Sequence, residues 1–141
     1  MGAATSDMQQ LGAGPVVIQL KGDPSQAYRR LVVWQKADEL AYQVYRVTKE
    51  FPDDERFGLI SQMRRASVSV AANIVEGYTH LTKKERRRFY EIARSSLTEL
   101  EYYIDFTYLR LEYMNQERYQ LLSALRQDVG RLLNGFMVSE R

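Results

Sequence analysis

From Leu31 onward, apolar residues recur every three or four positions in four successive stretches of the chain. This spacing places them on one face of an α-helix, which has about 3.6 residues per turn. Short polar segments separate the stretches, which cover residues 31–51, 57–77, 82–114 and 115–136. Helices joined by short connections pack as antiparallel neighbours. We therefore predict an all-α protein, an antiparallel up-and-down four-helix bundle over residues 31–141.

Local signals mark the ends of the predicted helices. Pro52 pushes the residue before it out of the helical region, so the first helix is expected to end there. Gly77 fits the left-handed residue that ends many helices. Thr82 and Glu85 have the spacing of a capping box at the start of the third helix, and Asn115 is the expected cap of the fourth.

The N-terminal segment, residues 1–30, is rich in Gly, Ala, Ser and Gln and has no sustained apolar period. We predict a flexible or extended arm there. A chain of 141 residues can bury one continuous core, which favours a single bundle domain after the arm. A three-helix domain with an independent first helix is the weaker alternative.

Composition restricts the chemistry that the chain can perform. There is no cysteine, which excludes disulfides, thiolate nucleophiles and cysteine metal sites, and the single histidine, His80, does not make a metal site by itself. No phosphate-binding loop sequence occurs. We therefore expect no enzymatic activity, cofactor, metal or small-molecule substrate. Paired carboxylates at Glu76, Glu99 and Glu101 leave one catalytic alternative open.

The hydropathy pattern indicates neither export nor membrane insertion. The first residues do not combine a basic start with a long apolar run, and no stretch of about 18 apolar residues occurs. With no cysteine, the chain suits a reducing compartment, and we expect a cytoplasmic protein. The formal charge of +2 is too small to indicate a polyanionic partner by itself.

The distribution of charge is more informative than its sum. Residues 83–94 contain six basic and two acidic residues, and the basic side chains oppose the dipole of the helix that starts there. We hypothesise that this segment binds the phosphates of RNA or DNA while a tyrosine stacks on a base. Acidic residues of another subunit, or solvent alone, are the alternatives. The candidate residues are Lys83, Lys84, Arg86, Arg87, Arg88, Tyr90 and Arg94.

Two further sets of residues have patterns that indicate contacts. Small residues surround a polar row in the second helix, and this pattern predicts hydrogen bonds between helices. The expected hydrogen-bonding residues are Asn73, Glu76 and Glu99, with Arg65 as their counter-charge. An exposed polar face and a ligand site are the alternatives.

The ten tyrosines exceed what one small core can hold, and tyrosine suits subunit interfaces. The aromatic residues predicted to contact another copy are Trp34, Tyr42, Tyr45, Tyr102 and Tyr108.

Several segments resemble a known family. The sequences RRASVSVAANIVEG at residues 64–77 and FYEIARSSLTEL at residues 89–100, with Tyr108-Leu109 and VWQKA at residues 33–37, are similar to the four-helix bundle family of 23S rRNA intervening-sequence proteins. The resemblance covers nearly all of residues 31–137. It departs at Val75, where the family usually has alanine.

The resemblance implies a ring-shaped homopentamer encoded within inserts of bacterial large ribosomal RNA genes. The accessory variability determinants of diversity-generating retroelements are similar, and that branch is associated with a reverse transcriptase and with nucleic acid. Two functions are therefore predicted. The first is a homo-oligomeric accessory protein that binds RNA or DNA. The alternative is a protein-interaction scaffold, for example an accessory subunit of a reverse transcriptase, without direct nucleic-acid binding.

Overall fold

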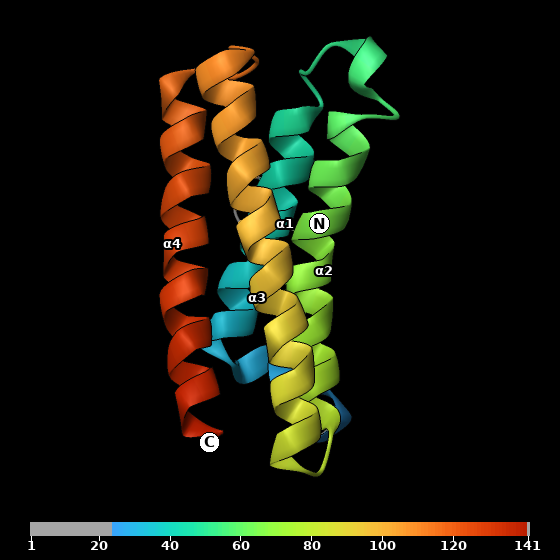
Figure 1. Cartoon of the computed structure of the whole chain (residues 1–141), viewed down its shortest axis with the longest axis vertical. Helices are drawn as coiled ribbons and strands as arrows, with labels where there is room; N and C mark the ends of the chain where they lie inside the picture. The colour runs from blue at the N-terminus through green and yellow to red at the C-terminus, as the bar shows by residue number, and fades with distance from the viewer. Residues whose placement is uncertain (1–23, 141) are drawn as a thin grey trace, which may run out of the picture.

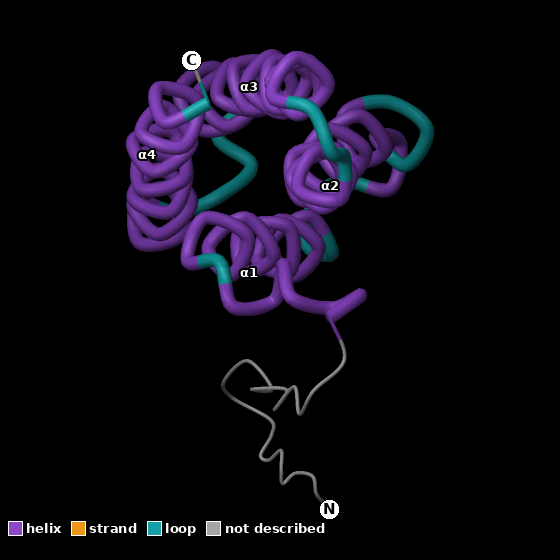
Figure 2. The backbone as a smooth tube through the Cα atoms, turned by 90° about the horizontal axis from the view of Figure 1, so that it is seen from below, coloured by secondary structure: helices purple, strands orange, loops and turns teal. Residues whose placement is uncertain are grey.

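The structure, a computed structural model, describes residues 24–140. Its long helices are α1 (Val32–Thr48), α2 (Leu59–Thr79), α3 (Lys83–Asp105) and α4 (Gln116–Ser139). Each helix packs on the next in the chain, and α4 returns to pack on α1 (Figures 1 and 2). The predicted all-α, antiparallel four-helix bundle is confirmed.

The core lies along the axis that the four helices surround. Each helix contributes a fully buried apolar side chain at its centre, represented by Leu40, Val70, Leu100 and Val129. Burying an aliphatic side chain of this size contributes about 1.5–3 kcal/mol to folding. The apolar periodicity of each helix therefore determines which face turns inward and which side chains remain on the surface.

The helix starts follow the predicted caps. The Thr82 side chain accepts a hydrogen bond from the Glu85 amide at 3.2 Å, and the Asn115 carboxamide oxygen accepts one from the Arg118 amide at 2.9 Å. Each bond satisfies an amide that has no partner within the first turn of a helix. The predicted caps Thr82 and Asn115 are thus confirmed, but among residues 24–140 the Glu85 carboxylate accepts no bond from the Thr82 amide, so the capping box is only half formed.

Two predicted helix ends are wrong. Gly77 does not form a left-handed cap, because α2 continues to Thr79. Its missing side chain instead permits close packing, since a Cβ atom there would lie 2.6 Å from Cε1 of Tyr90 on α3. The third helix does not run to residue 114 either, because α3 passes at Asp105 into the five-residue π-helical segment η3 (Phe106–Arg110).

Two short 3₁₀ segments complete the described chain, η1 (Pro24–Arg30) and η2 (Asp53–Glu55). The segment η1 packs against α1 and α2, and the Tyr28 ring meets the Trp34 ring edge-on at 5.1 Å between centroids. Residues 24–30 of the predicted flexible or extended arm thus form a 3₁₀ segment that packs on the bundle. The rest of the predicted arm lies outside the described residues. None of the helices between residues 24 and 140 has the length and apolarity needed to cross a membrane.

Candidate nucleic-acid interface

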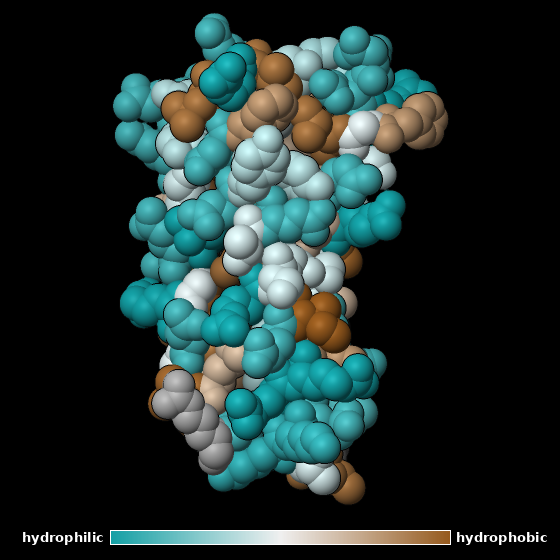
Figure 3. Space-filling view, viewed as in Figure 1, coloured by the Kyte–Doolittle hydropathy of each residue, from teal (hydrophilic) through white to brown (hydrophobic). Residues whose placement is uncertain are grey.

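The basic segment singled out from the sequence forms the first turns of α3. Residues Tyr90, Ala93 and Leu97 face the core, so the opposite side of the helix faces solvent. Five of the predicted basic residues are exposed there, and we call them the basic surface: Lys83, Lys84, Arg87, Arg88 and Arg94. Figure 3 shows that the face of the bundle carrying α3 is largely hydrophilic, with hydrophobic side chains gathered at its upper end.

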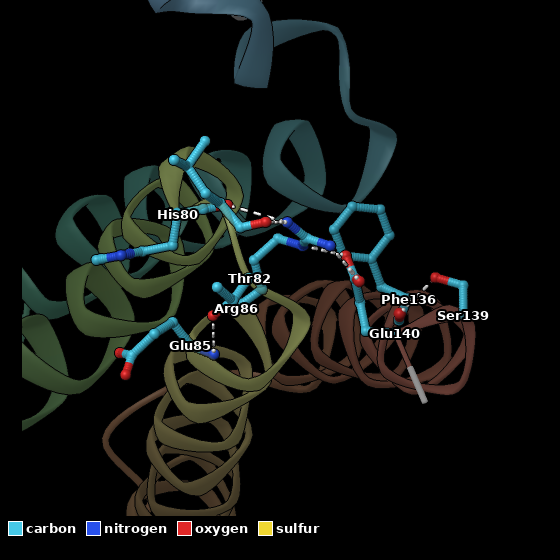
Figure 4. Close-up of polar contacts among 8 residues, drawn as sticks. His80, Thr82, Glu85, Arg86, Phe136, Ser139 and Glu140 are labelled. Carbon is cyan, nitrogen blue, oxygen red and sulfur yellow. Dashed lines mark hydrogen bonds and ion pairs between the residues drawn. The ribbon is translucent and has the colours of Figure 1, made fainter.

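Arg86 lies on the same turns but has a different role. Its Nε and Nη2 atoms donate to the two carboxylate oxygens of Glu140 at 2.8 and 2.9 Å. Its Nη1 atom donates to the backbone oxygens of His80 at 3.0 Å and Leu81 at 2.8 Å. The guanidinium thus ties the end of α4 to the α2–α3 turn, while the His80 ring points away from it (Figure 4).

These contacts correct the prediction that Arg86 binds nucleic acid. Four of the guanidinium contacts are made within the chain, and its side chain is only 21% exposed. A phosphate could reach it only by displacing the Glu140 carboxylate. That carboxylate is 54 residues away in the sequence, so no local pattern could have identified it.

The prediction that Tyr90 stacks on a base is also wrong. Its side chain is fully buried, and its ring meets the Phe136 ring edge-on at 5.1 Å between centroids. It cannot stack on a base from this position. Burial, with a contribution from the Glu140 carboxylate, raises the pKa of the Tyr90 phenol. Tyr90 is therefore a core residue that fills the space over Gly77.

The remaining cations differ in their neighbours. Arg88 lies 3.5 Å from Glu85, and Arg94 lies 2.9 Å from Glu91, both on exposed turns of the same helix. Exposed pairs of this kind are weak, and a phosphate can replace the carboxylate. Within residues 24–140, Lys84 and Arg87 have no ion pair. The basic surface therefore retains positive charge that the protein itself does not neutralise.

The hydrogen bonds between helices that were predicted for the polar set are wrong. Asn73 donates to the Ser69 backbone oxygen of its own helix at 2.8 Å, and Glu99 accepts from Tyr103 of its own helix at 2.7 Å. The latter bond raises the pKa of the Tyr103 phenol. The polar row of α2 faces outward, and the exposed members of the set are Arg65, Glu76 and Glu99. The bond between α2 and α3 joins the Ser69 and Ser96 hydroxyls at 2.8 Å.

The aromatic residues predicted to contact another copy divide into two groups. Trp34 and Tyr108 are half-buried and already pack on rings of their own chain, Tyr108 stacking on Tyr119 at 4.1 Å. Tyr42, Tyr45 and Tyr102 are exposed by 43%, 40% and 61%. The second group therefore leaves more ring surface exposed to a partner than the first.

One cation escaped the sequence analysis altogether. The Arg64 guanidinium on α2 lies 4.6 Å from the centre of the Tyr45 ring on α1. The two residues are 19 positions apart, and nothing in either local sequence indicates that they meet. Among residues 24–140, no group of three His, Asp or Glu side chains gathers where a metal ion could be held.

Comparison with known proteins identifies a family and a solved structure with a similar fold. The family model described as 23S rRNA-intervening sequence protein matches residues 29–135. A protein of unknown function from the S23 ribosomal protein family of Bacteroides thetaiotaomicron VPI-5482 is similar in structure, with 24% sequence identity and a TM-score of 0.67 over 75% of this chain and 98% of that chain. At this identity the structural likeness shows the fold alone. No curated protein matches the chain.

Proposed function

Since this chain belongs to the 23S rRNA-intervening sequence protein family, we propose that it is a non-enzymatic accessory protein that forms homo-oligomers and binds RNA. One observation carries the proposal. Lys84 and Arg87 lie exposed and without an ion pair among the described residues, at the end of α3 where the helix dipole disfavours positive charge. Their position does not stabilise the helix, whereas a bound phosphate would neutralise both cations.

The surroundings of these cations suit a nucleotide. A shallow depression further along α3 is lined by Arg88, Glu91, Ile92, Ser95, Ser96 and Glu99, and of its two carboxylates Glu91 is paired with Arg94. Ile92 is 39% exposed there and gives the depression an apolar patch. An unpaired base could rest on Ile92 while its phosphate meets Arg88. A base contact of this kind takes the place of the stacking on Tyr90 that the sequence suggested.

Assembly into a homo-oligomer would strengthen binding. A few exposed cations on one subunit give weak binding, but several copies in one assembly act together through a raised effective concentration. Tyr102 stacks on Phe106 with 5.7 Å between ring centroids, and Leu109 follows one turn later at 61% exposure. We call Tyr102, Phe106 and Leu109 the apolar strip and propose it as a subunit contact.

A matched pair of double variants tests the RNA contact. Lys84→Gln with Arg87→Gln removes two cations from the basic surface, and Arg56→Gln with Arg110→Gln removes two exposed cations from the opposite end of the bundle. Each phosphate contact with a single strand contributes about 0.7 to the slope of log affinity against log salt. The first variant should lower that slope by about 1.4 per subunit. The second should leave it nearly unchanged.

Fluorescence anisotropy with a labelled single-stranded RNA at several salt concentrations measures the slope, and light scattering measures the assembly. A homopentamer would have five times the subunit mass of 16.5 kDa. Both variants should keep the mass of the wild type. Equal losses of affinity in the two variants would mean that only net charge matters, and the basic surface would then not be the binding site.

A protein-interaction scaffold without nucleic-acid binding is the second candidate, favoured by the exposed apolar strip. Large exposed apolar patches mark protein contacts. The double variant Tyr102→Ser with Leu109→Ser tests whether the apolar strip contacts another subunit or a different protein. A smaller mass in light scattering would identify it as a subunit contact. An unchanged mass, together with no RNA binding by the wild type, would favour a scaffold that binds another protein, such as a reverse transcriptase.

A further inference from the structure

The outer face of α1 presents two tyrosine rings that the core does not use. Tyr42 and Tyr45 lie one helical turn apart and are exposed by 43% and 40%. This face is on the opposite side of the bundle from α3, as the view along the helices shows (Figure 2). The two rings therefore form a surface separate from the basic surface.

Arginine side chains accompany both rings. The Arg64 guanidinium lies 4.6 Å from the centre of the Tyr45 ring, and the Arg46 guanidinium lies 5.8 Å from the centre of the Tyr42 ring. Arg64 is also fixed by hydrogen bonds from Nε to the Thr48 hydroxyl at 3.0 Å and from Nη2 to the Tyr45 backbone oxygen at 3.3 Å. A guanidinium held in this way adds a planar, charged surface to the aromatic one.

The charge of this face is positive. Arg46, Arg64 and Lys49 lie around the two rings, and none of them has an ion pair within residues 24–140. Glu39 on α1 accepts a hydrogen bond from Gln43 at 2.7 Å, and Glu50, two residues beyond α1, is paired with Arg118. Arg46 and Lys49 are exposed and line a depression together with Arg118, Glu50 and Glu117, so cations outnumber carboxylates there.

We propose that this tyrosine–arginine surface, formed by Tyr42, Tyr45, Arg46, Lys49 and Arg64, binds single-stranded nucleic acid. Unpaired bases stack on the tyrosine rings and on the Arg64 guanidinium, while Arg46 and Lys49 contact the phosphates. A duplex cannot occupy the surface in this way because its bases are already stacked and paired. The site goes beyond the function proposed for α3, since it is a separate surface that adds stacking on aromatic rings.

The same charges disfavour a contact of this face with the same face of a second copy. A twofold contact between two copies of this face would bring the cations of one copy against those of the other. A polyanion with exposed aromatic bases complements both features of the surface, the positive charge and the free rings.

The test compares two pairs of substitutions with a single-stranded RNA decamer that carries 2-aminopurine at its centre. Tyr42→Phe with Tyr45→Phe keeps both rings and should bind as the wild type does, with the same quenching of 2-aminopurine. Tyr42→Leu with Tyr45→Leu keeps apolar bulk but removes the rings. It should bind roughly tenfold more weakly for each ring lost and should quench less. Both pairs change exposed side chains, and circular dichroism confirms that they fold.

An abasic decamer serves as the second probe, since it offers phosphates without bases. The wild type and the leucine pair should bind it with equal, low affinity. The proposal is overturned if the leucine pair binds the normal decamer as tightly as the wild type, or if the wild type binds both decamers equally. It is also overturned if the leucine pair changes the mass of the assembly, because the rings would then be a subunit contact.

The variant Lys84→Gln with Arg87→Gln separates this site from the basic surface. If both sites bind, that variant should weaken binding of the normal and the abasic decamers by the same factor while the quenching at saturation persists. Loss of quenching in that variant, with the tyrosines intact, would place the stacked base on α3 and would overturn the tyrosine–arginine surface. Unchanged affinity in that variant, with quenching intact, would contradict only the function proposed for α3.

Discussion

Tyr90 has a buried hydroxyl for which residues 24–140 provide no hydrogen-bond partner. The ring itself is well placed, since it packs over Gly77 and against Phe136. Tyr90→Phe therefore removes the one atom that is unfavourably placed and keeps every ring contact. We expect the variant to be more stable than the wild type, which is unusual for a change at a fully buried position.

The magnitude follows from the cost of burying a hydroxyl without a hydrogen bond, about 1–3 kcal/mol in protein mutants. The hydroxyl lies towards the end of the bundle, near the Arg86 and Glu140 side chains, where a small movement could offer it a partner. We therefore expect the lower end of the range. A gain of about 1 kcal/mol should raise the melting temperature by roughly 3–5 °C in a domain of this size.

Urea and thermal unfolding followed by circular dichroism measure the change. Tyr119→Phe is the matched control, because the Tyr119 hydroxyl donates to Asp105 at 2.8 Å. That control should lower the stability, opposite in sign to Tyr90→Phe. A loss of 1 kcal/mol or more in Tyr90→Phe would refute the reasoning, since it would show that the Tyr90 hydroxyl makes a favourable bond.

Three further changes, and one change of pH, have defined outcomes. Gly77→Ala should destabilise the bundle by about 1–2 kcal/mol in urea unfolding, because overpacking against Tyr90 exceeds the gain in helix propensity. Arg86→Gln should speed amide hydrogen exchange in the last turn of α4, because it releases Glu140. Arg86→Lys should show the same fast exchange, since lysine cannot make the two parallel bonds to the carboxylate. Unchanged exchange in Arg86→Gln would contradict the role of the Arg86–Glu140 pair in holding the end of α4. Asn115→Ala should cost about 1 kcal/mol through its lost cap, measured by thermal unfolding. Burial raises the pKa of Tyr90 above 10.0, so the unfolded chain releases this proton at a lower pH than the folded chain does. The unfolding free energy should therefore fall above about pH 10, and it should fall less in Tyr90→Phe.

Much of the fold and part of the candidate site follow from local sequence. The apolar period of α3 places Ala93 and Leu100 in the core, and Lys84 and Arg87 lie off that face and are exposed. The cap at Thr82 needs only an amide three residues away. Interactions within one or two helical turns can be predicted from the spacing of the residues, because the helix fixes their geometry.

Other assignments failed because they depend on residues far apart in the chain. Arg86 and Arg87 are adjacent and chemically identical, yet one is tied to Glu140 and the other is exposed. Tyr90 lies on the same face of α3 as Ala93 and Leu97, so the helix period is consistent with its burial, whereas its contact with Phe136 depends on α4. The helix period separates the inward side of α3 from its exposed side, but it does not identify the residues of α4 that Arg86 and Tyr90 contact.

The sequence by itself determined four amphipathic helices, their order and the N-cap residues of α3 and α4, because helix periodicity and capping are short-range properties. The tertiary structure alone decided that Arg64 on α2 meets Tyr45 on α1, and that Gly77 provides room for Tyr90 instead of ending α2. Both outcomes depend on how closely two helices approach and at what rotation. The packing of all four helices sets these quantities together, so they cannot be obtained from any one segment.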